Sequence, residues 1–219
     1  MSPCACRLRS EMPVALKLSV LLGVAAVVLT VAVAVSAGPL LTLDNVVASG
    51  LHTYALGHPS FVRAMQVWTD VFQPWTFRAI VIAAAVWLLW RRQVRTAAWA
   101  TGTILLCGAV ESGLKAWIGR ARPHWTHPVS AAVGDSFPSG HALTSAAGCA
   151  VLLALAWPTL GRRSRRAWSA VAVAVPFVTG FTRLALGVHF LSDVIGGWLI
   201  AAALFAAMTL ALSTDRAGQ

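Results

Sequence analysis

Six apolar runs, each about 20 residues long, constrain the fold of this chain more than any other feature of its sequence. A helix of about 20 residues is long enough to cross the hydrocarbon core of a bilayer. Charged residues make up 11% of the chain, whereas soluble domains average about 25%. A soluble helical protein is therefore the poorer interpretation. We predict an all-α, polytopic membrane protein whose six transmembrane helices lie within residues 18–37, 71–90, 97–118, 139–160, 167–188 and 191–213.

The rest of the sequence contains no low-complexity linker, internal repeat or soluble domain, so we expect residues 1–219 to form a single membrane-embedded domain. Residues 1–17 would be a cytoplasmic tail. The first apolar run has two interpretations, a retained span or a cleaved signal peptide with a cleavage site near residues 35–37. Its length exceeds the roughly 7–15 residues of a signal core, which favours the retained span. The more polar residues 39–73 predict short helices that lie at the membrane surface.

The positive charge of the chain is concentrated in two short gaps between apolar runs. A net charge of +10 can indicate a nucleic-acid partner, but basic loops in this position are typical of cytoplasmic retention. We therefore predict an integral protein of the cytoplasmic membrane, with both termini cytoplasmic and no nucleic-acid partner. Residues 39–73, residues 120–138 and the turn near residue 188 would then face the outside or the periplasm. The two clusters are Arg91, Arg92 and Arg95, and Arg162, Arg163, Arg165 and Arg166.

The four cysteines do not form a disulfide framework. Cys107 and Cys149 lie inside apolar runs, where buried free thiols are ordinary. Cys4 and Cys6 form a CxC pair near the N-terminus, which is a weak signal because structural zinc usually has four ligands. No segment clusters the oxygen ligands that hard metal ions require. We expect neither a metal ion nor a cofactor.

Three polar segments fall at the outer ends of the predicted spans, and the first contains two cations. Lys115 lies in the outer turn of the third span, and Arg122 follows it just before Pro123. The proline disfavours helix at Arg122. The two cations could bind an anion, or they could simply extend toward the headgroups, as basic side chains at helix ends do.

The second segment reads as a turn that enters a helix. Pro138, Ser139, Gly140 and His141 stand directly before the fourth apolar run. Free backbone amides at a helix start bind anions, and glycine allows the backbone to approach a ligand closely. The alternative is that Ser139 is only an N-cap and His141 an interfacial histidine with a local partner.

The third segment pairs a histidine with a carboxylate. His189 and Asp193 are four residues apart, and Arg183 precedes them. If the sixth helix begins near His189, the two side chains share a face. A carboxylate bonded to one ring nitrogen fixes the tautomer and leaves the other nitrogen free to attack. The alternative is a structural pair that caps the helix.

Together these segments place three cations, an anion-binding turn and two histidines at one membrane face. Such a set suits a phosphoryl group, whose charge is spread over its oxygens. The pattern Lys-x6-Arg-Pro, Pro-Ser-Gly-His and Arg-x5-His-x3-Asp, from residue 115 to residue 193, resembles the type 2 phosphatidic acid phosphatase family. The resemblance is to its bacterial membrane-embedded members, and the wider superfamily includes the haloperoxidases. One departure is Thr182, where the family usually has serine.

The resemblance implies a role for each residue of the pattern. His189 would attack phosphorus and become a phosphohistidine, Asp193 would orient His189, and His141 would protonate the leaving oxygen. The residues expected to bind the substrate phosphate are Lys115, Arg122, Arg183, Ser139 and Gly140. Thr182 keeps the hydroxyl and is not expected to be catalytic.

Two further residues stand close to the pattern. We interpret Arg120, which is not part of it, as basic surface that faces anionic lipid. Glu111 lies four residues before Lys115 and would pair with it one helical turn deeper, because carboxylates inside a membrane usually have a partner.

The function predicted from these observations is an integral membrane lipid phosphatase without a metal ion. Its substrate would be a lipid phosphate or pyrophosphate of the undecaprenyl pyrophosphate, phosphatidic acid or phosphatidylglycerol phosphate type. One alternative is a phosphotransferase that moves phosphoryl or phosphoalkyl groups between lipids. Another, from a different class, is a non-enzymatic lipid transporter. A vanadate-dependent haloperoxidase is disfavoured because the haloperoxidases of the superfamily are soluble. The sequence does not determine the lipid or the oligomeric state.

Overall fold

The computed structural model describes the backbone of residues 3–217 and the side chains of residues 16–213. All regular structure in this part of the chain is helical. Cys4 and Cys6 lie outside the described side chains, whereas Cys107 and Cys149 are free thiols, as expected. The helices are α1 (Pro3–Ala34), α2 (Gly38–Gly57), α3 (Pro59–Val71), α4 (Pro74–Trp90), α5 (Val94–Ile118), α6 (Gly140–Ala156), the 3-10 turn η1 (Trp157–Thr159), α7 (Arg162–Ala185) and α8 (Leu191–Ala217).

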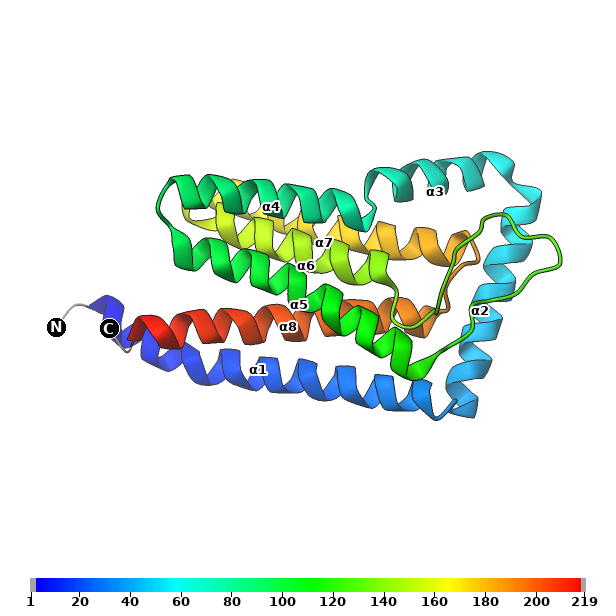
Figure 1. The fold of residues 1–219 in the computed structure, drawn as a ribbon, viewed down its shortest axis with the longest axis horizontal. Coiled ribbons are helices and arrows are strands. Elements are labelled where there is room, and N and C mark those ends of the chain that lie inside the picture. The colour runs from blue at the N-terminus through cyan, green and yellow to red at the C-terminus, as the bar shows by residue number, and fades with distance from the viewer. Residues whose placement is uncertain (1–2, 218–219) are drawn as a thin grey trace.

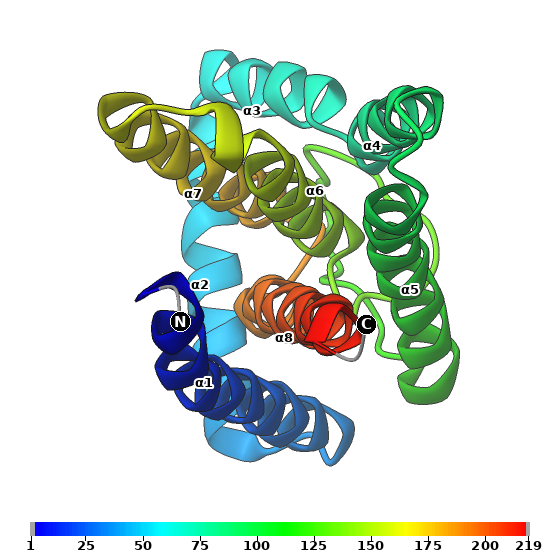
Figure 2. The same cartoon turned by 90° about the vertical axis from the view of Figure 1, so that its left-hand side faces the viewer.

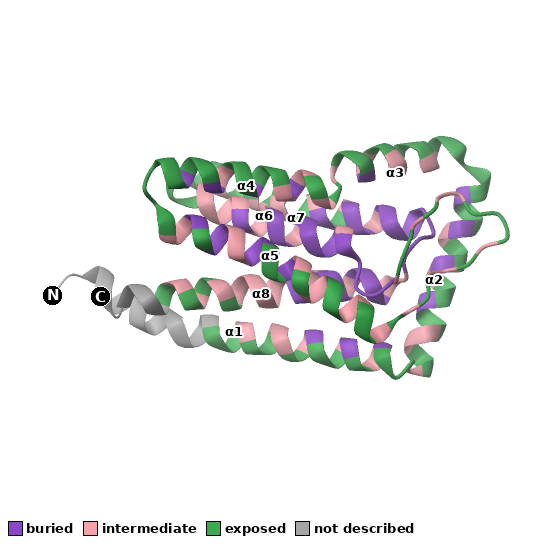
Figure 3. Cartoon of the chain, viewed as in Figure 1, coloured by how far each residue is buried: buried purple, intermediate pink, exposed green. Residues whose placement is uncertain are grey.

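The long helices run side by side along one axis, and α2 lies across one end of the bundle (Figure 1). Seen along that axis, α6 is central, with α4, α5, α7 and α8 around it and α1 outside against α8 (Figure 2). The main apolar core joins α4, α5, α6 and α8 around Val81, Ile104, Leu143 and Ile200. Exposed positions cover the outer faces of the bundle, while buried positions gather toward the end that α2 crosses (Figure 3).

The predicted set of spans is confirmed: among the described residues, 6 helices are long and apolar enough to cross a membrane. Their exposed faces carry large apolar side chains, such as Leu21, Val86 and Val173. The protein is therefore a polytopic helical membrane protein. Several boundaries differ by a few residues, and the second candidate span is longer than predicted, because Pro59–Trp90 contains both α3 and α4. Helix α4 itself begins at Pro74 rather than at residue 71. Proline has no backbone N–H to continue a helix from α3, but it is well suited to starting a new one.

The segment 39–73 is more regular than predicted. We expected short surface helices, but α2 has 20 residues and α3 has 13. On α2, Asp44, Ala48, His52 and Ala55 are buried along one face, with the three- and four-residue spacing of a helix that packs on one side. The segment therefore forms a long helix across the bundle end and a second helix that leads into α4. Similarly, α1 begins at Pro3, inside the expected tail 1–17.

The connections between helices divide between the two ends of the bundle. The α4–α5 and α6–α7 connections, which carry the basic clusters, lie at the end where α1 starts and α8 finishes (Figure 1). Helix α2, the loop 119–139 and the α7–α8 turn lie at the opposite end. The three polar segments of the sequence therefore converge at one end, which is the arrangement that the six-span topology predicts.

The start of α6 packs against α8 so closely that only glycine fits at Gly197. A Cβ atom there would lie 2.9 Å from the Ser139 carbonyl oxygen and 3.1 Å from the Leu143 amide nitrogen. Both contacts are with backbone, so the helix itself would have to move. Gly113 on α5 is a helical glycine with nothing within 4 Å of an added Cβ.

We predict that Gly197→Ala lowers the free energy of unfolding by about 1–3 kcal/mol, because overpacking forces the two helices apart. The matched variant Gly113→Ala should be neutral or stabilising, since alanine is the better helix former. Thermal denaturation of both variants in detergent measures the difference. Equal melting temperatures for the wild type and Gly197→Ala would contradict the tight contact.

Candidate active site

The centre of the polar cluster is a contact between His189 and Asp193. The histidine Nδ1 lies 3.3 Å from the aspartate Oδ2, and both side chains are buried. Helix α8 begins at Leu191, so His189 stands in the turn before it and Asp193 in its first turn. Asp193 Oδ2 also accepts the Phe190 amide at 2.8 Å. The aspartate therefore caps the start of the helix and also lies beside the histidine ring.

The second ring nitrogen of His189 faces a cation. Arg122 Nη1 lies 2.9 Å from His189 Nε2. Because the carboxylate accepts a hydrogen bond from the Nδ1–H group, Nε2 carries the lone pair. Arg122 also donates from Nε to the Gly134 carbonyl and from Nη1 to the Val188 carbonyl, each at 2.8 Å. This arginine therefore links the loop 119–139 to the α7–α8 turn. Its guanidinium also lies against His189 Nε2, the nitrogen predicted to attack.

Burial decides the charge state of the His189 ring. Desolvation lowers its pKa to about 4, the contacts with Asp193 oppose this, and Arg122 and Arg183 add to it. The ring is therefore neutral at pH 7. Burial also lowers the pKa of Arg122, against the attraction of nearby carboxylates, but guanidinium groups titrate so high that Arg122 stays charged.

Arg183 reaches the same region from the last turn of α7. Its side chain is 6% exposed, and Nη1 donates to Thr69 Oγ1 on α3 at 3.0 Å. Its buried Nε has no hydrogen-bond partner among the side chains and backbone that the structure describes. The hydroxyl of the neighbouring Thr182 donates to the Thr179 carbonyl of the same helix. The Thr182 hydroxyl is therefore bonded within α7, whereas the Nε–H group of Arg183 is available to a ligand.

Lys115 is held by the partner that its spacing predicts. Its Nζ lies 2.8 Å from Glu111 Oε1, and Arg78 on α4 lies 3.7 Å from Glu111 Oε2. The Glu111 carboxylate also rests against Gly140, where an added Cβ would collide with it. The predicted Glu111–Lys115 pair is confirmed. Gly140 allows another group to approach the backbone closely, and in this structure that group is the Glu111 carboxylate.

The turn Ser139–Gly140–His141 starts α6. Ser139 is fully buried, its hydroxyl accepts the Ala142 amide, and its own amide donates to the Asp193 carbonyl at 3.0 Å. The first-turn amides of Gly140 and His141 have no carbonyl within the helix to bond. His141 is half-buried and interacts electrostatically with Arg183, His189, Lys115 and Arg122. The predicted residues thus come together, with Ser139 in the capping role that was its alternative.

The interpretation of Arg120 as lipid-facing surface was wrong. Its side chain is 10% exposed and forms ion pairs with Asp193 and Asp44, each at 2.7 Å. Asp44 lies on α2, and the sequence analysis did not single it out. One sequence signal could have identified Asp44. It shares a helical face with Ala48, His52 and Ala55, and a carboxylate on such a face is expected to be buried and to have a charged partner.

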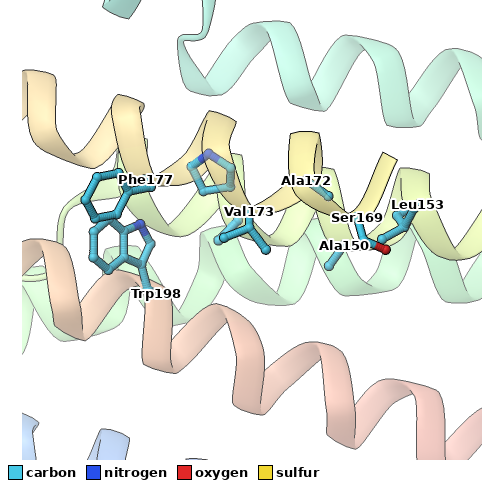
Figure 4. A pocket seen from close by; sticks show the side chains of 9 residues that line it. Ala150, Leu153, Ser169, Ala172, Val173, Phe177 and Trp198 are labelled. Carbon is cyan, nitrogen blue, oxygen red and sulfur yellow. The ribbon is translucent and has the colours of Figure 1, made fainter. Parts of the chain in front are cut away.

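One groove of the bundle lies apart from these charged residues. This groove, between α6, α7 and α8, has a volume of about 370 Å³. Its lining is apolar, with side chains such as Val173, Phe177 and Trp198, and also includes Ser169 (Figure 4). None of the predicted site residues lines it. Among the described side chains, no group of three or more His, Cys, Asp or Glu residues converges as metal ligands would. The convergence of charged groups, and not cavity size, locates the candidate site.

The helical membrane bundle carries, at one end, a buried histidine–carboxylate pair with arginines around it. The family model of the PAP2 superfamily matches residues 96–217. This match covers more than half of the chain, which therefore belongs to the PAP2 superfamily.

Two curated relatives match a shorter region. The chain is 35% identical over 95 residues to phosphatidylglycerophosphatase B of Bacillus subtilis (strain 168), covering 42% of this chain and 46% of that protein. It is 39% identical over 110 residues to lipid A 1-phosphatase of Rhizobium etli, covering 44% of each. The chain therefore spans less than half the length of either relative.

A solved structure shares the fold over most of the chain. The crystal structure of the first transmembrane PAP2-type phosphatidylglycerolphosphate phosphatase from Bacillus subtilis superposes with a TM-score of 0.72, at 22% identity, over 92% of this chain and 97% of that one. This likeness supports the helical architecture.

We predict that Gly140→Ala lowers the free energy of unfolding by about 1 kcal/mol, because the new methyl group displaces Glu111 from Lys115 and breaks a charged hydrogen bond. In a Glu111→Ala background the same change should cost much less, since the two effects are coupled. Melting temperatures of the two single variants and the double variant, in detergent, measure the coupling. Additive effects would show that Glu111 does not occupy the space beside Gly140.

We predict that the His189 ring stays neutral at pH 6.5, where an ordinary histidine is half protonated. The pKa of about 4 caused by burial places its titration well below that value. Nitrogen NMR of histidine-labelled protein in micelles, assigned with a His189→Gln variant, measures the midpoint. A midpoint at or above 6.5 would contradict the burial argument.

Proposed function

We propose that this protein is an integral membrane phosphatase that hydrolyses a lipid phosphate or pyrophosphate through a phosphohistidine intermediate. The observation that carries the proposal is the placement of His189, with Nδ1 beside the Asp193 carboxylate and Nε2 beside the Arg122 guanidinium. Asp193 orients the ring and complements the positive charge that develops on it, as in other nucleophile–base–orienter arrangements.

The proposed reaction has two steps. In the first, His189 Nε2 attacks phosphorus, the bond from phosphorus to the leaving oxygen breaks, and His141 protonates that oxygen. In the second, a water molecule loses a proton to His141 and attacks phosphorus, the phosphorus–nitrogen bond breaks, and inorganic phosphate leaves. His141 returns to its protonated form and His189 to its neutral form. Each histidine is regenerated, so the cycle requires only the lipid and water.

Binding of the phosphate requires a rearrangement at Arg122. Its Nη1 covers Nε2 at 2.9 Å, so it must turn from the ring nitrogen to a phosphate oxygen before attack. Arg183, with its unused Nε, and Lys115 would contact the other oxygens, joined by the first-turn amides of Gly140 and His141. Such donors are most effective when they are fixed where charge develops. Ser139 supports this turn as the α6 cap.

A lipid substrate fits the position of the site. The polar cluster lies at one end of a bundle whose outer faces are apolar, so a bilayer-anchored substrate can reach it by diffusing in the plane of the membrane. The basic clusters at the opposite end support an outer or periplasmic location for the site. The relatives named for phosphatidylglycerophosphate and lipid A phosphatase activity support a lipid phosphomonoester. A transport pathway would instead distribute charges through the bilayer depth.

We predict that His189→Ala lowers the rate of phosphate release at least about 10³-fold, the effect of removing a nucleophile that acts in a catalytic unit. The measurement is release of inorganic phosphate in detergent with EDTA present, over a panel of monophosphate and pyrophosphate lipids. The matched control is His58→Ala, because His58 is exposed and its ring bonds the Tyr54 carbonyl and stacks on the Tyr54 ring, away from the candidate site. Failure of folded wild-type protein to release phosphate from any lipid, or full activity of His189→Ala, would refute the proposal.

A further inference from the structure

A buried ion-pair chain runs from α2 to the candidate catalytic pair. Arg120 Nη2 donates to Asp44 Oδ2, and Arg120 Nη1 donates to Asp193 Oδ1, each at 2.7 Å. The guanidinium also lies 4.4 Å from the centre of the Phe190 ring. The three ionised residues come from α2, from the loop after α5 and from α8, so they join segments that are 73 and 76 residues apart in the chain.

The two oxygens of Asp193 have different partners. Oδ2 faces His189 Nδ1 and accepts from the Ser136 hydroxyl and the Phe190 amide. Oδ1 accepts from Arg120. A carboxylate held at one oxygen can turn about its Cβ–Cγ bond, whereas one held at both oxygens cannot do so without breaking a strong contact. Arg120 therefore fixes the plane of the carboxylate that faces His189.

Asp44 in turn fixes Arg120. It is 1% exposed, and its two oxygens also accept the amide and the hydroxyl of Ser192, in the first turn of α8. The positive end of the helix dipole stabilises a carboxylate at this position. Arg120 is thus held between two carboxylates that are anchored on the same helix start. The planar guanidinium of Arg120 can donate to both carboxylates at once, whereas a lysine would supply only a point charge.

We infer that Arg120 and Asp44 are positioning residues for the phosphatase reaction: Asp44 orients Arg120, and Arg120 fixes the Asp193 carboxylate against His189. The inference rests on the proposed function. Neither residue is placed to contact the substrate phosphate. The helix α2, which crosses the end of the bundle, would then contribute, through Arg120 and Asp193, to the reactivity of a histidine more than a hundred residues away in the chain.

The test compares Arg120→Gln, Arg120→Lys and Asp44→Asn with the wild type, as full-length protein in detergent with a lipid that the wild type hydrolyses. We expect kcat to fall roughly 10- to 100-fold in Arg120→Gln, the size of loss known for removing partners that orient the histidine ligands of metal sites. KM and the inhibition constant of inorganic phosphate should change less than about twofold, because the phosphate-binding cations are untouched. Arg120→Lys should recover part of kcat. The matched control is Arg63→Gln on the exposed face of α3.

A double variant isolates the role of Asp44. If Asp44 acts through Arg120, Asp44→Asn lowers kcat alone but has no further effect in the Arg120→Gln background. Additive losses would overturn that part of the inference. An unchanged kcat in folded Arg120→Gln, or a fall in melting temperature with an unchanged kcat per folded molecule, would show a purely structural role. An equal rise in KM and in the phosphate inhibition constant would show phosphate binding instead.

A second readout does not depend on turnover. Removing the Arg120 charge leaves the Asp193 carboxylate freer to stabilise a protonated His189, whose other charged neighbours are Arg122 and Arg183. The NMR titration midpoint of His189 should therefore rise in Arg120→Gln relative to Arg63→Gln. An unchanged midpoint would overturn the inference even if the substrate were still unknown. A wild type that hydrolyses no lipid phosphate, with a shifted midpoint, would refute the proposed function but support the positioning role.

Discussion

The buried carboxylate of Asp193 is the group on which the rest of the polar end of the molecule depends. A charge without solvent contact requires partners on both oxygens, and this one takes them from His189, Ser136, Phe190 and Arg120. Those partners lie on the loop 119–139 and on the turn before α8. Satisfying one carboxylate therefore brings together the segments that form the candidate site.

The membrane setting explains why the site is so well connected. The outer faces of the bundle are apolar, so ionised groups can gather only where they find one another or meet water at a helix end. Arg122 binds backbone carbonyls of two connections, Lys115 binds Glu111, and Arg120 binds two carboxylates. Each cation thus has a structural partner as well as a proposed function. A phosphate that binds here must compete for cations that already support the fold.

Local signals in the sequence were sufficient for several features. Run length and hydropathy predicted the spans, the four-residue spacing predicted the Glu111–Lys115 pair, and the Pro138–Gly140 turn predicted the α6 start. The same reasoning failed for α2, whose polar positions suggested short surface pieces although one face is buried. It also failed for Arg120, since nothing local distinguishes an exposed arginine in a loop from one that bridges two distant carboxylates.

What the sequence by itself determined is the kind of molecule and the chemical groups available to it: six apolar helices, with cations and two histidines at one end. These follow from short-range periodicity and from the cost of placing polar groups in lipid. Only the tertiary structure decided which groups meet. Asp44 is 148 residues from Ser192 and 76 from Arg120, and such contacts depend on how the helices pack. The partner of a buried charge is a property of the whole fold.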